Sequence, residues 1–201
     1  MKKLSFITVL GILFAAAVHN RATAQTFDAA FGVGTLLAPS ASSASGDHNP
    51  VSLTGGAYPA FGADFLFKKN FGISGELAWR ASQNIYGLFG VQPYRPLFYD
   101  FGAIYAPHLK KVGAELQAGI GWESIRFYQP FIQCSFVSCT DFVSSNHFLG
   151  HFGGGIRYYV WGHLFLRPEA HLYVIHNNLE FSSPIATRVG MSIGYSFAPG
   201  F

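Results

Sequence analysis

The chain has 201 residues, of which 50% are hydrophobic, 17% aromatic and only 11% charged. So low a charged fraction and so high an apolar fraction exclude an intrinsically disordered chain. The net charge of +3 comes from Lys2, Lys3 and Arg21, which lie in a segment that we expect to be removed. Without these three, the 13 basic residues become ten, against ten acidic ones. The remaining chain is neutral and lacks the basic surface that a nucleic-acid partner requires.

Residues 1–24 have the organisation of a secretory signal peptide. A positively charged start at Lys2 and Lys3 is followed by the uncharged apolar run 4–18 and by the small residues Ala22 and Ala24. The run is shorter than the ~20 residues that a membrane-spanning helix needs. We therefore expect cleavage after Ala24. The mature domain is then 25–201, located outside the cytoplasm.

Beyond the signal peptide, apolar residues recur with a period of two, which is typical of strands with two different faces. No stretch is continuously apolar for 18 residues, so no transmembrane helix is expected. Turn signals divide this part of the chain into eight predicted strands: 27–37, 57–67, 71–81, 97–107, 112–124, 148–160, 164–174 and 185–197.

The two faces of these strands differ sharply in composition. One face is aromatic, aliphatic and uncharged, as in Phe27, Phe31 and Val33 of the first strand. The opposite face carries glycines and every charged residue of the strands, together with two histidines. This charged set comprises Asp28, Asp64, Glu76, Arg80, Asp100, Glu115, Glu123, His151, Arg157, Arg167, Glu169, His171 and Arg188.

The orientation of the faces decides the class of protein. A soluble lipocalin-type barrel would turn the apolar face inward and leave an outer face of few charges diluted by glycine. A membrane barrel would turn the apolar face toward lipid, where Arg or Lys at mid-bilayer costs about 2–4 kcal/mol. We favour the membrane barrel. Because eight strands enclose a space that side chains fill, we expect glycine and alanine to occupy the inner positions between the charges.

The connections between the strands support this orientation. Three are short (68–70, 108–111 and 161–163) and alternate with four long ones (39–56, 82–96, 124–147 and 176–184). Outer-membrane barrels have this arrangement of short periplasmic turns and longer external loops. Because hydrocarbon offers no hydrogen-bond partner, every strand edge in the membrane must be paired with another strand. The predicted fold is therefore all-β: a closed eight-stranded antiparallel up-and-down transmembrane β-barrel.

With its signal peptide, its eight alternating strands and the segments 147–158 and 188–197, the chain resembles the small outer-membrane β-barrel family. That family includes the transmembrane domain of outer membrane protein A and the outer membrane protein X group. The resemblance covers residues 25–201. It implies residence in a bacterial outer membrane, contact with its lipid and lipopolysaccharide, and a monomeric state. It also implies that Phe201 is the aromatic ending recognised by the barrel assembly machinery, although Ala198, Pro199 and Gly200 interrupt the last strand.

The charged set admits two interpretations. Buried charges persist when they are paired, and breaking one pair costs about 3–5 kcal/mol. We therefore expect a mutually neutralising network that plugs the lumen. The alternative is a narrow channel for small solutes.

Cys134 and Cys139 lie in the third long connection, where an oxidising compartment favours a disulfide. With His147 and His151 they also form a Cys-x4-Cys-x7-His-x3-His string that is a weaker candidate for zinc. Its Cys-to-His gap is short for a zinc finger, and His151 falls in a predicted strand. We expect the disulfide, with no metal and no cofactor.

The loops 83–95 and 125–146 are unusually apolar for exposed segments. They are candidates for binding a surface ligand, which gives a structural or adhesion-like role; packing of the loops on one another or on lipopolysaccharide is the alternative. A lipid-A-modifying enzyme would need a nucleophile, a histidine and a carboxylate at the external rim. The sequence offers only loose candidates for this chemistry, Asp47 with His48 and Asp141 with Ser144 and His147. We expect a protein that is not an enzyme.

Overall fold

The structure is a computed structural model that describes residues 26–39, 51–68, 70–86, 92–109, 111–134 and 139–197. The expected signal peptide, the Asp47–His48 pair and Phe201 lie outside the described residues.

No helix in the described part of the chain is long and apolar enough to cross a membrane.

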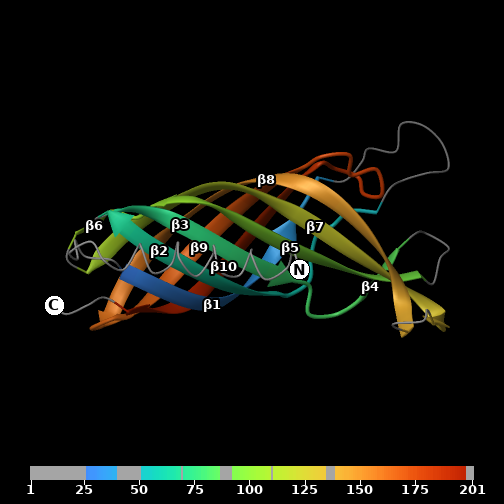
Figure 1. The fold of residues 1–201 in the computed structure, drawn as a ribbon, viewed down its shortest axis with the longest axis horizontal. Helices are drawn as coiled ribbons and strands as arrows, with labels where there is room; N and C mark the ends of the chain where they lie inside the picture. Colours follow the sequence, from blue (N-terminus) through green and yellow to red (C-terminus); the bar gives the residue numbers. More distant parts are fainter. Residues whose placement is uncertain are drawn as a thin grey trace, which may run out of the picture.

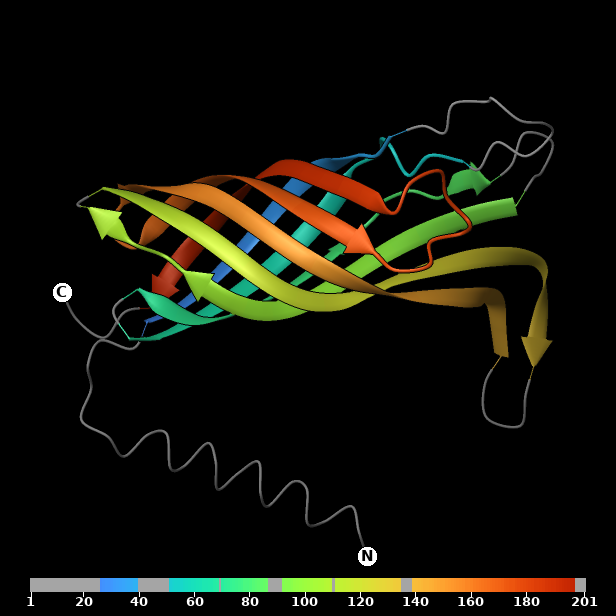
Figure 2. The same cartoon turned by 90° about the horizontal axis from the view of Figure 1, so that it is seen from above.

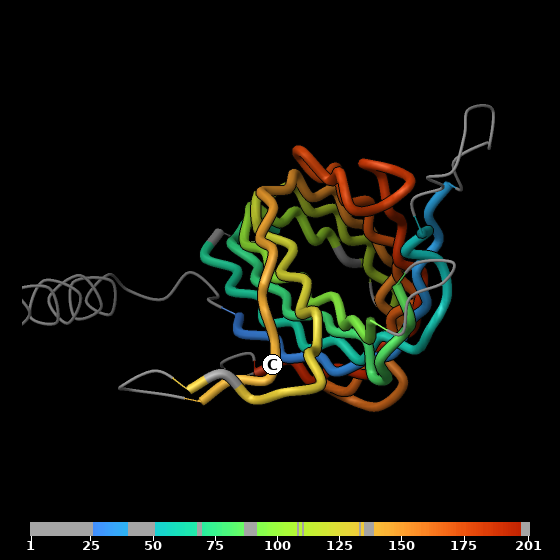
Figure 3. Tube along the Cα trace, turned by 90° about the vertical axis from the view of Figure 1, so that its right-hand side faces the viewer, coloured from blue at the N-terminus to red at the C-terminus, as the bar shows by residue number. Residues whose placement is uncertain are grey.

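The described residues form ten strands. Their bounds are β1 Thr26–Leu37, β2 Tyr58–Lys68, β3 Phe71–Trp79, β4 Asn84–Tyr86, β5 Gln92–Tyr105, β6 His108–Leu109, β7 Val112–Cys134, β8 Cys139–Trp161, β9 Leu164–Ile175 and β10 Ile185–Phe197. Eight of them close into a ring in the order β1, β2, β3, β5, β7, β8, β9, β10, and every pairing is antiparallel. The view along the ring in Figure 3 shows this closure. The predicted eight-stranded up-and-down architecture is confirmed.

The first and last strands close the ring in continuous register. Phe27 lies opposite Phe197 and Leu37 lies opposite Thr187, with no bulge between these two pairs. The short strands β4 and β6 lie outside the ring and pair only with an end of β5 and of β7, respectively. The ring therefore leaves none of its eight strands with an open edge along its shared length (Figure 1).

The largest departure from the predicted elements lies in the third long connection. Residues 125–146 were expected to be a loop, but most of them belong to β7 and β8, each 23 residues long. Their paired ends extend beyond the other strands as a hairpin (Figure 2). The alternation of the ring does not continue into this segment because the apolar residues change face, from the outward-facing Ile120 to the fully buried Ile125. The register of the pair also shifts between Tyr128 and Gln133. β5 likewise begins at Gln92 rather than 97, since Pro93 and Pro96 are accommodated within a strand.

The outer surface of the ring is an apolar band. Phe31, Ile73, Leu116, Phe152 and Met191 are all more than half exposed, although they lie on five different strands. A water-soluble protein buries such side chains, whereas a bilayer solvates them. The predicted outward orientation of the apolar face therefore holds in the structure.

Charged side chains occupy the middle of the interior, and apolar side chains occupy its two ends. Leu66, Ile104 and Ala106 cluster at the end with the short turns. A larger apolar cluster lies toward the long connections and includes the fully buried Leu36, Tyr58, Phe98 and Tyr173. The expectation that glycine and alanine fill the inner positions was therefore wrong for this end. Few charges enter it, so large apolar side chains pack there instead; the rings of Phe98 and Tyr173 stack with centroids 4.9 Å apart.

The outer band predicts a position-dependent penalty for a buried charge. Met191 lies at the centre of β10 and faces outward, so Met191→Arg should lower the free energy of unfolding in phospholipid vesicles by about 2–4 kcal/mol. Leu109→Arg is the matched control, because Leu109 is 84% exposed beside a short turn, where water is accessible. Urea unfolding followed by tryptophan fluorescence measures both. Equal penalties for the two variants would contradict a lipid-facing band.

Candidate functional site

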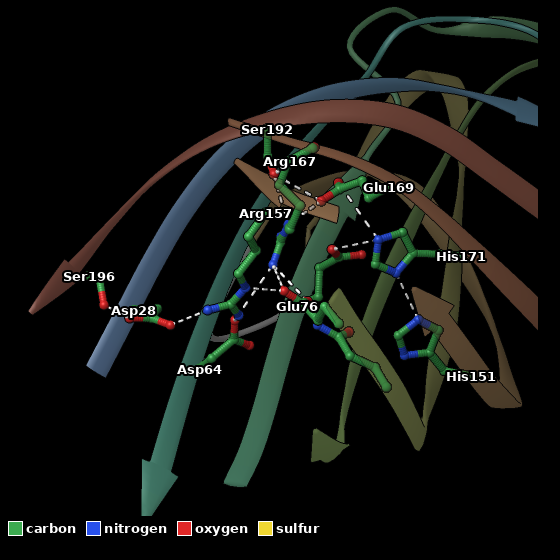
Figure 4. A network of polar contacts seen from close by, with 12 residues as sticks. Asp28, Asp64, Glu76, His151, Arg157, Arg167, Glu169, His171, Ser192 and Ser196 are labelled. Carbon is green, nitrogen blue, oxygen red and sulfur yellow. Dashed lines mark hydrogen bonds and ion pairs between the residues drawn. The ribbon is translucent and has the colours of Figure 1, made fainter. Parts of the chain in front are cut away.

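All thirteen residues of the predicted charged set lie inside the ring. None is more than 8% exposed. They come from all eight ring strands and, for Arg80, from the residue after β3, and they point inward because they share one parity of the alternation. Figure 4 shows the central part of the set.

Arg157 of β8 forms the first centre of this network. Its guanidinium contacts three carboxylates: Asp28, Asp64 at 2.7 Å and Glu115 at 2.5 Å. The hydroxyl of Ser196 donates a second hydrogen bond to Asp28, at 2.5 Å. One arginine thus links β1, β2, β7 and β8 across the interior.

Arg167 of β9 forms the second centre. Its Nε donates to Glu169 at 2.7 Å, and its Nη1 donates to Glu115 at 2.8 Å. Ser192 donates to the same oxygen of Glu169 at 2.9 Å. Because Glu115 accepts from both arginines, the two centres form one continuous network.

A row of imidazoles continues from this network toward the opposite wall. Nδ1 of His151 lies 2.7 Å from Asp100, and Nε2 of His151 lies 2.9 Å from Nδ1 of His171. The remaining nitrogen of His171 faces Glu76 at 3.6 Å and Glu169 at 3.7 Å. Arg188 donates to Glu76 at 2.6 Å. The hydroxyl of Tyr173 donates to Glu76 at 3.2 Å. Tyr173 belongs to the larger apolar cluster, so this hydrogen bond connects the charged group to that cluster.

Two predicted members stand apart from this network. Glu123 is fully buried, and neither of its carboxylate oxygens has a hydrogen-bond partner within the described residues. Two guanidinium nitrogens of Arg80, Nε and Nη1, likewise have no hydrogen-bond partner within the described residues. Both residues lie at the end of the interior that carries the long connections, where apolar residues dominate.

The residues of the cysteine–histidine string occupy different parts of the structure. Cys134 and Cys139 are joined by a disulfide, with an S–S distance of 2.10 Å, near the tip of the hairpin. His151 contacts Asp100 inside the ring, and His147 contacts Glu180 in the connection after β9. The four side chains therefore do not assemble into one zinc site.

The structure brings together a serine, a histidine and a carboxylate that differ from the predicted loose set. Ser145 lies 3.0 Å from Nε2 of His147, and Glu180 lies 3.1 Å from that same nitrogen. Ser145 donates its proton to Glu180 directly, at 2.7 Å. A catalytic triad needs the carboxylate on the other ring nitrogen, so that the histidine can accept the serine proton. This arrangement therefore serves to tie β8 to the connection 176–184.

Sequence reasoning missed Ser145 and Glu180 in this arrangement. Glu180 is the only carboxylate between β9 and β10, which singles it out, but its partner depends on where the long β8 passes. Burial alone would raise the pKa of Glu180. Hydrogen bonds from Ser145 and from its own backbone, together with His147, outweigh burial and lower that pKa below its ordinary value of 4.5.

Aromatic side chains from the long connections pack against one another. Tyr86 of β4 contacts Tyr94, Phe127 and Phe181, with ring centroids 5.3–6.1 Å apart. Its hydroxyl also donates to the backbone carbonyl of Glu180 at 2.8 Å. The apolar residues at both ends of the loop 83–95 thus contribute to the packed external end of the ring, as the alternative interpretation of this loop expected.

A closed antiparallel ring, an apolar outer band and a charged interior define an integral β-barrel of the kind found in bacterial outer membranes. No family model and no curated protein sequence matches the chain. Among solved structures, it is similar to Neisserial surface protein A, with a TM-score of 0.56 and 9% identity over 85% of this chain and 96% of that one. It is also similar to Ail, the attachment invasion locus protein of Yersinia pestis, with a TM-score of 0.52 and 11% identity over 86% of this chain and 99% of that one. At these identities the likeness establishes the fold.

The network predicts a large effect of removing its first centre. Arg157→Met leaves three buried carboxylates without their common partner, so the free energy of unfolding should fall by about 3–5 kcal/mol. Arg126→Met is the control, since Arg126 lies over the ring of Phe142 on the hairpin and should contribute less than about 1 kcal/mol. Urea unfolding in vesicles and heat-modified gel mobility report the difference. An unaltered Arg157→Met variant would contradict a network that supports the fold.

The Ser145–His147–Glu180 contact predicts a pH-dependent attachment of the connection 176–184. A carboxylate with a lowered folded-state pKa contributes stability above its unfolded pKa and loses that stability as the pH falls through the folded value. Amide hydrogen exchange, corrected for intrinsic rates, should therefore speed up in this connection below about pH 4.5. The Glu180→Gln variant should exchange fast at pH 7 and at pH 3 alike. If Glu180→Gln kept the wild-type pH dependence of exchange, a group other than Glu180 would be responsible for it.

Proposed function

We propose that this protein is a surface-interaction protein of the outer membrane, and that the hairpin formed by residues 125–134 of β7 and 139–146 of β8 binds an extended polypeptide. One observation carries the proposal: the hairpin presents apolar side chains outside the apolar band of the ring. Phe131 and Ile132 are 59% and 69% exposed, and Val143 on the opposite strand is 49% exposed. An apolar surface on a rigid element beyond the membrane is typical of a binding site.

The hairpin also offers a free strand edge. β8 pairs with β9 only from Leu149 onward, so residues 139–144 have a strand neighbour on the β7 side alone among the described residues. Unpaired backbone groups at a strand edge bind extended segments of other chains by adding a strand. The disulfide between Cys134 and Cys139 restrains the hairpin near its tip, which lowers the entropy lost when a partner binds.

The charges around the hairpin favour a polypeptide over a polyanion as the partner. Ail was solved in complex with the heparin analogue sucrose octasulfate. In the external segments described for this chain, Arg95 and Arg126 are balanced by Asp141 and Glu180. Without a basic excess, attraction to a sulfated sugar is weak, whereas exposed aromatic and aliphatic side chains suit an apolar segment.

The remaining parts of the proposal concern placement in the membrane. Residues 1–24 are the cleaved signal peptide, and 25–201 are the barrel domain. The apolar band contacts outer-membrane lipid, and lipopolysaccharide surrounds the external rim. Phe201 serves as the signal for the barrel assembly machinery, and the protein acts as a monomer.

We further propose that the interior is sealed and that the protein has no catalytic role. Thirteen buried charged or histidine side chains and the aromatic cluster above them support a lumen that does not conduct. The placement of Ser145 and Glu180 on one nitrogen of His147 argues against acyl transfer at the rim.

Replacing the exposed apolar pair of the hairpin tests the proposed binding surface. The double variant Phe131→Ser/Ile132→Ser should bind immobilised, carboxymethylated unfolded lactalbumin at least tenfold more weakly than wild type, when both are held in lipid nanodiscs. Leu109→Ser/Trp161→Ser is the matched control, because these residues are 84% and 82% exposed at the opposite rim. The control should bind like wild type. An equal loss in both variants, or in neither, would contradict a specific role for the hairpin.

A further inference from the structure

Three ligand atoms from opposite walls of the barrel converge inside the ring. They are Nε2 of His171, the Oε2 oxygen of Glu76 and the Oε1 oxygen of Glu169, and all three residues are buried. The ligand atoms of the group lie within 4.8 Å of one another. Glu76 comes from β3 and the other two from β9, four strands away around the ring. Figure 4 shows His171 facing the two carboxylates.

The contacts around His171 suit a tautomer in which Nδ1 carries the proton. Nδ1 of His151 lies 2.7 Å from Asp100, and in the neutral tautomer that donates to this carboxylate, Nε2 of His151 presents a lone pair. That lone pair accepts the Nδ1 proton of His171. In a neutral His171 the lone pair of Nε2 then faces two carboxylates, and this nitrogen has no hydrogen-bond partner in the described part of the chain, although the side chain is only 2% exposed. Arg188 approaches one of these three acceptors, Oε1 of Glu169, at 3.3 Å. Acceptors that face one another favour a further positive charge between them.

The charge balance of the interior requires such a charge as well. Seven buried carboxylates face four buried arginines, which leaves an excess of three negative charges among the described residues. Lys111, the one lysine whose side chain the structure describes, is exposed. Neutralisation must therefore come from added protons or from a bound cation.

The opposite atom of each converging group is already held. Arg188 donates to Oε1 of Glu76 at 2.6 Å and lies 3.3 Å from Oε1 of Glu169, and Arg167 donates to Oε2 of Glu169 at 2.7 Å. His151 occupies Nδ1 of His171. Outer contacts of this kind orient the ligands of metal sites, including the carboxylate–histidine contacts that fix the imidazole.

A glycine makes room for the row of imidazoles. A Cβ at Gly153 would lie 2.8 Å from Nδ1 of His171 and 3.0 Å from Nε2 of His151. A side chain at this position would collide with both imidazole rings, so glycine lets the backbone of β8 lie directly against them.

We propose that Glu76, Glu169 and His171 bind one divalent transition-metal ion of the zinc type, and that this ion ties β3 to β9 across the interior. Metal bonds of about 2.0–2.2 Å in a tetrahedral site separate ligand atoms by about 3.3–3.6 Å, close to the 3.6 and 3.7 Å from His171 to the two carboxylates. One imidazole and two carboxylates suit Zn²⁺ better than Ca²⁺ or Mg²⁺, which prefer oxygen ligands alone. Water completes the fourth position.

Cobalt provides the direct test, because Co²⁺ occupies zinc sites and absorbs visible light when it is bound. Purified protein is unfolded in urea with a chelator, freed of the chelator and refolded into detergent micelles with Co²⁺. We expect one cobalt per chain by elemental analysis, together with a visible absorption band that Zn²⁺ abolishes. Zn²⁺ should also raise the midpoint of thermal unfolding of the wild-type protein. A refolded protein that holds no metal would overturn the proposal and assign the positive charge to protons.

His171→Gln tests the assignment of the ligands. This variant should bind Co²⁺ at least 100-fold more weakly than wild type, whereas His176→Gln, which removes an exposed histidine beyond the same strand, should bind like wild type. Undiminished binding in the first variant would place the metal elsewhere and overturn the proposal. If His171→Gln does not refold, Glu76→Gln serves in its place, and the measurements on wild-type protein decide in either case.

Discussion

The backbone hydrogen bond determines this structure more than any side-chain contact does. Hydrocarbon offers no partner for an unpaired amide or carbonyl group, so a sheet in a membrane must close on itself. The pairing of β1 with β10 and of β5 with β7 meets this requirement. Once the ring is closed, the alternation along each strand assigns every side chain to lipid or to the interior. The uncharged outer band and the charged interior are therefore two results of one constraint.

Charges placed inside the ring need partners there, and the geometry of a small barrel supplies them. Arg157 and Arg167 reach carboxylates on strands that are distant in sequence, and Glu115 connects the two arginines. Such contacts cross the interior instead of running along the wall. They oppose flattening of the ring, a deformation that hydrogen bonds between neighbouring strands resist only weakly. The aromatic cluster around Phe98 and Tyr173 fills the end that the network does not reach.

The eight ring strands could be predicted from the sequence because the period-two alternation is local and strong. So could the inward direction of the charged residues, which follows from parity. The partners within the network could not, because the pairing of Arg157 with Asp28 spans 129 positions and depends on the register of several strands. The contact of Ser145 with Glu180 was missed for the same reason. The hairpin could not be predicted from the alternation, because the apolar residues of β7 change face between the outward-facing Ile120 and the buried Ile125.

The unbroken register between β1 and β10 places the first and last described residues of the ring side by side at one rim. The ring is thus topologically a circle with a single gap, and the short connections from β2 to β3, from β5 to β7 and from β8 to β9 leave strands that end at that same rim. Moving the gap to any of these connections, with a linker across the present ends, would preserve every pair of neighbouring strands. A circular permutation of this kind changes which strand comes first in the chain. It leaves unchanged which strands are neighbours around the ring, and that cyclic order is what the fold depends on.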